Sequence, residues 1–268
     1  MRTARLSLTL VAALAVTFVF PSVASANESI EYVAMGDSFA SGSGAGNYAE
    51  ISTDSWKGGD CLQSQNAYSP LLADQLGATL DFQSCSGAKV ADIHSDQLPA
   101  LSAGTDLVTL SVGGNDVGFS SVIITCTTSS TAGCTDKVEA AEADAQQRLP
   151  GLLSDLYAEI GSRAPNAQVL ILGYPKLFSG RSCFGNTGIN LDEQARINEA
   201  NYVLNGVIST AAQNAGFTYV DPIPAFEGHG VCTSGAYVNG LRFNIPESYH
   251  PNRNGHGIGY MEALNAHL

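Results

Sequence analysis

Residues 30–43 read Ile30-Glu31-Tyr32-Val33-Ala34-Met35-Gly36-Asp37-Ser38-Phe39-Ala40-Ser41-Gly42-Ser43, and the architecture of the chain can be worked out from them. The first half is apolar and β-branched, which predicts a buried strand. The second half is rich in Gly, Asp and Ser, which predicts a tight turn. A strand that stops at this turn places Ser38 at the carboxyl edge of a sheet, where open α/β folds bind their ligands. Ser38 is therefore a candidate nucleophile.

The N-terminal segment has the pattern of a secretory signal. Two arginines precede an apolar run that ends at Pro21, and residues 24–26 form a small-residue cleavage site. The apolar run is short for a membrane-spanning helix. We therefore expect residues 1–26 to be removed on export. A single domain, residues 27–268, would remain as a secreted, extracellular protein without stable membrane insertion.

The chain is acidic, with a formal net charge of −13 at pH 7 over 268 residues. An acidic chain without a basic cluster is a poor partner for nucleic acid, because phosphate binding depends on Lys and Arg. The same charge argues against electrostatic docking on anionic membranes. We therefore expect no nucleic-acid partner, and nothing in the sequence indicates more than a monomer.

Six cysteines in an exported chain predict disulfide bonds. None of them has the two-residue spacing of a zinc knuckle, which argues against a metal site. Many pairings are possible in principle. We favour nearest neighbours in sequence, because each such pair would cross-link a loop between strands. The cysteines are Cys61, Cys85, Cys126, Cys134, Cys183 and Cys232.

Strands that alternate with helices predict an α/β fold, a three-layer α/β/α sandwich around a parallel sheet. After the opening strand, further strands are expected at residues 79–83, 107–112, 168–173 and 217–220. Helices are expected at residues 68–76, 136–163, 191–213 and 255–267, with Pro150-Gly151 dividing the second of them.

Small polar residues follow three of the predicted strands, near Ser38, Gly87 and Asn115. Because the carboxyl ends of parallel strands meet at one edge of a sheet, these positions can converge. A serine hydrolase needs a general base near its hydroxyl and donors aimed at the developing oxyanion. The backbone N–H groups of Ser38 and Gly87, with the side-chain amide of Asn115, would supply three donors.

A histidine at the same edge would supply the base, and His250 is the best candidate among five histidines. Pro251 keeps His250 out of a helix, and Asn254 can cap the helix that follows. An imidazole held just before a helix is well placed to face the sheet edge. We expect structural or surface positions for His94, His229, His256 and His267.

These motifs, in this order, resemble the blocks of the SGNH (GDSL) hydrolase superfamily, and in particular its secreted actinobacterial (Streptomyces-type) lipases and esterases. The similarity covers essentially all of residues 27–268. It implies a flavodoxin-like parallel sheet of about five strands, with Ser38 as nucleophile and His250 as base. It also implies an oxyanion hole of Ser38, Gly87 and Asn115. The blocks are Gly36-Asp37-Ser38, Gly87, Gly113-Gly114-Asn115-Asp116 and His250, and the implied disulfides are Cys61–Cys85, Cys126–Cys134 and Cys183–Cys232.

One position departs from the family pattern. The family usually has Asp three residues before the histidine, and this chain has Glu247. A glutamate could orient His250 and stabilise its charged form, but its extra methylene shifts the carboxylate. Some relatives use a backbone carbonyl in this loop instead, and the carbonyl of Ser248 is that candidate. Both remain open from the sequence, with a slight preference for Glu247 as the third member.

The sequence thus predicts a serine carboxylic-ester hydrolase that needs no metal or organic cofactor and acts on a small-molecule or lipid ester through an acyl-enzyme. Lipase or esterase activity comes first. Phospholipase A1 and carbohydrate acetylesterase are alternatives, because variable loops form the groove. A non-enzymatic binding module would be expected to lack Ser38, Asn115 or His250, and all three are present.

Overall fold

The computed structural model describes residues 29–49, 61–184 and 188–268. At its centre lies a parallel five-stranded sheet of order β2-β1-β3-β4-β5. This is the flavodoxin-like order, so the predicted fold class is confirmed. The segment interpreted as a signal, residues 1–26, lies outside the described residues. The strands are β1 (Glu31–Gly36), β2 (Thr79–Phe82), β3 (Leu107–Ser111), β4 (Gln168–Leu172) and β5 (Thr218–Val220).

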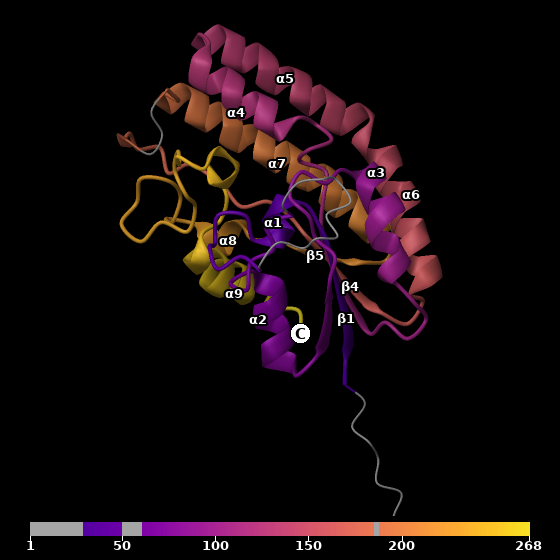
Figure 1. Cartoon of the computed structure of the whole chain (residues 1–268). Helices are drawn as coiled ribbons and strands as arrows, with labels where there is room; N and C mark the ends of the chain where they lie inside the picture. The colour runs from indigo at the N-terminus through magenta and orange to yellow at the C-terminus, as the bar shows by residue number, and fades with distance from the viewer. Residues whose placement is uncertain (1–28, 50–60, 185–187) are drawn as a thin grey trace, which may run out of the picture.

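Helices cover both faces of the sheet (Figure 1). One face carries α2 (Tyr68–Leu76), α8 (Ile223–Phe226) and α9 (Met261–Asn265). The other face carries α3 (Val90–Asp92), α6 (Leu149–Arg163) and α7 (Leu191–Asn214). Two further helices, α4 (Phe119–Thr128) and α5 (Thr131–Gln147), lie beyond the carboxyl edge. Shorter turns are η1 (Ile93–Gln97), η2 (Leu98–Ala100), η4 (Ile245–Glu247) and η5 (Gly255–Tyr260).

The central strand β3 explains where the site can form. All five of its residues are buried, as expected for a strand with helices on both sides. Its register places Ser111 opposite Gly36 of β1. The two strands therefore end side by side, and the loops that follow them start from adjacent points on the carboxyl edge.

The helical region after β3 differs from the sequence prediction in two ways. The break between α5 and α6 falls at Arg148 rather than at Pro150-Gly151. Pro150 lies in the first turn of α6. Backbone N–H groups in a first turn have no acceptor within the helix, so a proline there costs no helical hydrogen bond. Helix α4 was not predicted, because its β-branched and hydroxyl residues are weak helix formers. It packs on α5 and is cross-linked to it through Cys126–Cys134.

The C-terminal helix also differs in detail from the prediction. It begins with the π-helical turn η5 and continues as α9. Asn252, rather than Asn254, caps this region, because Asn252 Oδ1 accepts hydrogen bonds from the backbone N–H groups of Asn254 and Gly255 at 2.9 and 3.1 Å.

The disulfides are the three sequential pairs that the resemblance implied: Cys61–Cys85, Cys126–Cys134 and Cys183–Cys232. Within the described part of the chain, no helix is both long enough and apolar enough to cross a membrane.

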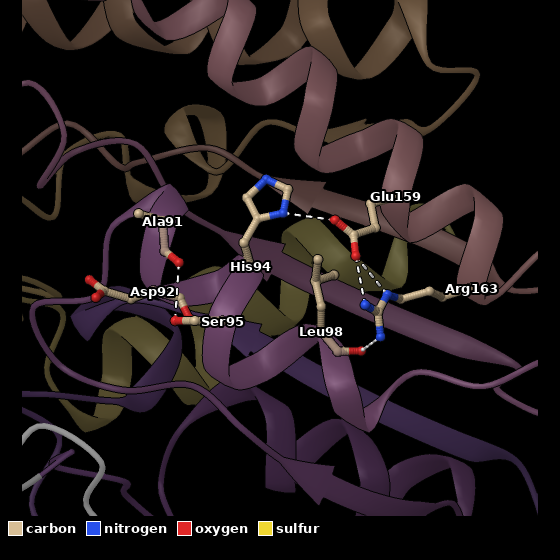
Figure 2. A network of polar contacts seen from close by, with 7 residues as sticks. All are labelled: Ala91, Asp92, His94, Ser95, Leu98, Glu159 and Arg163. Carbon is tan, nitrogen blue, oxygen red and sulfur yellow. Dashed lines mark hydrogen bonds and ion pairs between the residues drawn. The ribbon is translucent and has the colours of Figure 1, made fainter.

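His94 belongs to a polar network with Glu159, Arg163 and Leu98, which Figure 2 shows. Its Nδ1 lies 2.9 Å from Glu159 Oε2, and the Oε1 atom of Glu159 accepts a hydrogen bond from Arg163 Nε at 2.9 Å. Arg163 Nη1 also donates to the carbonyl of Leu98 at 3.4 Å. The network ties η1 and η2 to helix α6, so His94 has the structural position expected from the sequence.

Gln97 holds the end of β1 in place. Its Oε1 accepts from the Gly36 N–H at 2.7 Å, and its Nε2 donates to the Gly36 carbonyl at 3.0 Å. The Gln97 side chain is completely buried. The buried amide thus gives the Gly36 N–H an acceptor and the Gly36 carbonyl a second donor, since this carbonyl also accepts from the Cys85 N–H at 2.9 Å.

We expect Gln97→Ala to lower the free energy of unfolding by roughly 1–3 kcal/mol, because the buried Gly36 N–H loses its acceptor. Urea unfolding with the disulfides intact measures this change. The control is Gln75→Ala, an exposed glutamine on α2, which should change stability by less than about 0.5 kcal/mol. Equal effects of the two substitutions would contradict the assignment.

Candidate active site

The backbone at Gly36 and Asp37 determines where Ser38 lies. Gly36 has φ +135°, and a Cβ there would lie 2.5 Å from the Ser111 carbonyl oxygen, so a side chain does not fit. Asp37 is the N-cap of the one-turn helix α1 (Ser38–Ser41), and its Oδ1 accepts from the Phe39 N–H at 2.9 Å. Ser38 is therefore the first residue of a short helix rather than part of a simple turn.

Ser38 and His250 form a hydrogen-bonded pair. Ser38 Oγ lies 2.7 Å from His250 Nε2, although 212 positions separate them in sequence. His250 Nδ1 lies 2.9 Å from the Ser248 carbonyl oxygen. Because a carbonyl can only accept, Nδ1 carries the proton and Nε2 has a free lone pair. The ring is therefore held in the tautomer that can accept the Ser38 proton.

Glu247 makes a different contact from the one its position suggested. Its Oε1 accepts from the hydroxyl of Tyr48 at 3.0 Å and from the side-chain amide of Asn244 at 2.9 Å. The Tyr48 hydroxyl in turn accepts from the Gly44 N–H at 2.8 Å. Glu247 thus connects the loop before His250 to the loop after α1. The group within hydrogen-bonding distance of His250 Nδ1 is the Ser248 carbonyl.

Burial controls the protonation of His250. The side chain is 8% exposed, and its ring lies against Phe39 and Phe119, with centroid distances of 4.7 and 6.3 Å. Burial lowers the pKa of His250 to about 4, although the Ser248 carbonyl and the charge of Glu247 favour the protonated form. At pH 7 the imidazole is therefore neutral, as a general base must be.

The candidate oxyanion donors lie in the same groove as this pair, whose wall includes Ser38, Gly87, Asn115 and His250. Asn115 Nδ2 donates to the Ala88 carbonyl at 3.0 Å, which ties the turn after β3 to the turn around Gly87. The structure thus brings together the positions singled out from the sequence at the carboxyl edge.

Tyr174 is a residue of this region that the sequence analysis missed. Its hydroxyl donates to Asp37 Oδ2 at 2.6 Å and accepts from the Gly114 N–H at 2.9 Å. Burial raises the pKa of Asp37 to about 7, and the Tyr174 hydrogen bond opposes that rise. Tyr174 therefore links the N-cap of α1 to the Gly113–Asp116 turn. Its place two residues after the end of β4, at the same sheet edge, was the signal available in the sequence.

The family model of the GDSL-like lipase/acylhydrolase family matches residues 34–258. The chain belongs to this family. It is accordingly a serine hydrolase that acts on esters, as the sequence predicted.

Individual relatives of this GDSL-family chain cover most of its length. Lipase 1 of Streptomyces coelicolor is 41% identical over 87% of this chain and 85% of the relative. The solved extracellular lipase of Streptomyces rimosus superposes with a TM-score of 0.83 at 38% identity, covering 90% of this chain and all of that one. A phospholipase A1 of Streptomyces albidoflavus NA297 superposes with a TM-score of 0.82 at 38% identity and the same coverage.

A more distant solved structure shares the fold alone. An acetyl-xylooligosaccharide esterase of Geobacillus superposes with a TM-score of 0.51 at 18% identity, covering 88% of this chain and 93% of that one.

Within residues 29–49, 61–184 and 188–268, no group of three or more His, Cys, Asp or Glu residues is arranged to hold a metal ion.

The low pKa of His250 predicts the acid limb of the pH profile. We expect kcat/KM for a neutral ester to stay near its plateau from pH 7 to about pH 5, and to fall roughly tenfold per pH unit below about pH 4. The neutral ring is the active form, so activity is lost as the pH falls through the pKa of the folded state. An acid limb centred between pH 6 and 7 would contradict this.

Stability must be controlled in that experiment. The unfolded chain binds a proton at His250 near the ordinary value of 6.5, whereas the folded chain does so near 4. This group therefore reduces stability as the pH falls from about 6.5 to about 4, and has no effect above that window. Samples held at each pH and assayed after return to pH 7 separate reversible titration from unfolding.

The contacts of Glu247 predict a small effect of its removal. We expect Glu247→Ala to reduce kcat by less than about tenfold, because the Ser248 carbonyl still holds His250, whereas loss of a true carboxylate partner costs on the order of 10⁴. Steady-state kinetics on a soluble short-chain ester measure this. Glu247→Gln is the matched control, since it keeps an acceptor for Tyr48. A loss of several orders of magnitude in both variants would restore the carboxylate as the partner of His250.

Proposed function

We propose that this protein is a secreted lipase or esterase that cleaves acylglycerols and simple carboxylic esters through an acyl-enzyme on Ser38. The observation that carries the proposal is the 2.7 Å contact of Ser38 Oγ with His250 Nε2, with the opposite ring nitrogen held by the Ser248 carbonyl. Membership of the GDSL family and the similarity to Streptomyces lipases support it.

Acylation begins when Ser38 Oγ attacks the ester carbonyl carbon and His250 Nε2 takes its proton. The carbonyl oxygen gains negative charge, which the N–H groups of Ser38 and Gly87 and the Asn115 amide stabilise. When the tetrahedral intermediate collapses, the ester C–O bond breaks, and the alcohol leaves with the proton from His250. A water molecule, deprotonated by the same nitrogen, then attacks the acyl carbon. The bond from this carbon to Ser38 Oγ breaks, Ser38 Oγ takes the proton back from His250, and the acid is released.

The third catalytic group in this proposal is the Ser248 carbonyl. Glu247 acts less directly, through its charge and by holding the loop. The carbonyl fixes the tautomer and the plane of the imidazole through its hydrogen bond to Nδ1. Its dipole also stabilises the imidazolium that forms during each step. The charge of Glu247 favours the same imidazolium from a greater distance, while its hydrogen bonds hold the loop.

Phospholipase A1 activity is the second candidate function, because the phospholipase A1 of Streptomyces albidoflavus is as similar in structure as the lipase of Streptomyces rimosus. The same catalytic set would serve it. Deacetylation of polysaccharides has weaker support, since the acetyl-xylooligosaccharide esterase shares the fold at 18% identity.

Extracellular action is part of the proposal. The signal-like pattern of residues 1–26, three disulfides and a relative described as an extracellular lipase all favour an oxidising compartment. We propose a monomer, because one chain supplies Ser38, Gly87, Asn115 and His250 to the groove.

The decisive experiment is hydrolysis by the purified, oxidised chain 27–268. The panel holds p-nitrophenyl esters from acetyl to palmitoyl, a triacylglycerol and a phosphatidylcholine, and Ser38→Ala is the control. We expect turnover of acyl esters longer than acetyl, and loss of both turnover and fluorophosphonate labelling in Ser38→Ala. The triacylglycerol and phosphatidylcholine assays distinguish lipase from phospholipase.

Two results would refute parts of the proposal. Turnover of acetyl esters alone would replace the lipase by a carbohydrate esterase. Turnover that is unchanged in Ser38→Ala, or absent from every substrate, would remove the serine mechanism.

A further inference from the structure

Two apolar cavities meet at Ser38. The first is the groove described above, which runs from His250 along α4 and the loop at residues 241–246, and its volume is about 390 Å³. The second, called here the helical cavity, lies among α4, α5 and α7 and has a volume of about 70 Å³. Both have Ser38, Asn115 and Phe119 in their walls.

The chemistry assigns different parts of an ester to the two cavities. His250 must hand its proton to the leaving alcohol, so the alcohol oxygen has to lie within reach of His250 Nε2. His250 lines the groove. The acyl chain is attached to the carbonyl carbon through a different bond, so it extends away from the alcohol oxygen. The helical cavity shares Ser38 and Asn115 with the groove, but His250 is not among the residues that line it, so it borders the carbonyl carbon on a side where no proton has to be delivered.

We propose that the helical cavity binds the acyl chain and that the groove binds the alcohol part of the ester. This inference rests on the proposed function and adds to it a division of the substrate between two sites. It makes the residues of α5 and α7 the determinants of acyl-chain length.

The lining of the helical cavity suits a hydrocarbon chain. Apolar side chains from three helices form most of it, among them Phe119, Val122, Val138, Ala141, Ile197 and Leu204. Apolar walls around a few satisfied polar groups are typical of sites for apolar ligands.

Polar side chains in this lining have protein partners. Asn201 Nδ2 donates to the carbonyls of Tyr174 and Pro175 at 3.1 and 2.9 Å. Glu142 is paired with Arg196, with 2.7 Å between Glu142 Oε1 and Arg196 Nη1. A hydrocarbon chain can therefore enter without taking a hydrogen bond from a buried polar group.

The volume sets a limit on chain length. One water occupies roughly 10–15 Å³ of such a cavity, so about 70 Å³ accommodates roughly five to seven groups of methylene size. Together with the carbonyl carbon, this corresponds to acyl chains of roughly six to eight carbons. The larger groove has room for a bulky alcohol.

Two adjacent alanines of α5 offer a matched test. Ala141 lines the helical cavity, and Ala140 is exposed on the same helix. Ala141→Phe would fill the cavity, whereas Ala140→Phe adds the same ring to the solvent side. The milder Ala141→Leu repeats the test with less added volume, and it is the variant used if thermal unfolding shows that Ala141→Phe does not fold.

The measurement is kcat/KM for octanoyl and acetyl esters of the same alcohol, expressed as a ratio. We expect the Ala141 variants to lower the octanoyl-to-acetyl ratio by roughly ten- to a hundredfold, the range that exclusion of methylenes from a pocket produces. Ala140→Phe should leave the ratio unchanged. An unchanged ratio in both Ala141 variants would overturn the inference.

A second arm tests the groove. Ile124 on α4 lines the groove and is 59% exposed. With the acyl chain fixed, Ile124→Trp should change KM across a series of alcohols from methyl to glyceryl, and it should not change the octanoyl-to-acetyl ratio. If Ile124→Trp altered the acyl ratio and Ala141→Phe altered the alcohol series, the two assignments would be reversed.

These outcomes are separate from the proposed function. Failure of the proposed function would appear as a parent enzyme without Ser38-dependent turnover of any ester. Failure of this inference alone would appear as an active parent whose acyl preference does not respond to residue 141.

Discussion

The close approach of β1 to β3 at Gly36 is the constraint on which the site depends. A side chain at Gly36 would collide with the Ser111 carbonyl, and both backbone groups of Gly36 pair with the buried amide of Gln97. Asp37 N then donates to the Ser111 carbonyl at 3.0 Å. The chain can therefore turn sharply out of the sheet, and Ser38 starts a helix at the point where the two central strands end.

Burial around this point adjusts the chemistry of the site. His250, enclosed by Phe39 and Phe119, remains neutral at pH 7 because a charged ring would lose its hydration. A neutral carbonyl from Ser248 is a suitable partner for such a ring, since it fixes the tautomer without burying a second charge. The carboxylate of Glu247 is only partly buried and is bound to Tyr48 and Asn244.

Local sequence signals predicted most of the framework because they act over a few residues. Helix α2 begins and ends where its apolar spacing predicted, and β3 was evident as a continuous apolar run. Helix α4 was missed because its weak propensity is overcome by packing and by the Cys126–Cys134 cross-link. The helix break at Arg148 was displaced from Pro150, since proline fits in a first turn as well as after a last one.

The sequence by itself determined the fold class, the order of the motifs and the identity of Ser38, Gly87, Asn115 and His250 as candidates, because strand ends and turn residues are encoded locally. The tertiary structure decided the contacts among them. Whether Glu247 or the Ser248 carbonyl reaches His250 depends on the path of the loop before His250, and whether Tyr174 reaches Asp37 depends on how segments 137 positions apart pack together. Hydrogen bonds need a narrow range of distances and angles, and residue type and spacing do not specify these.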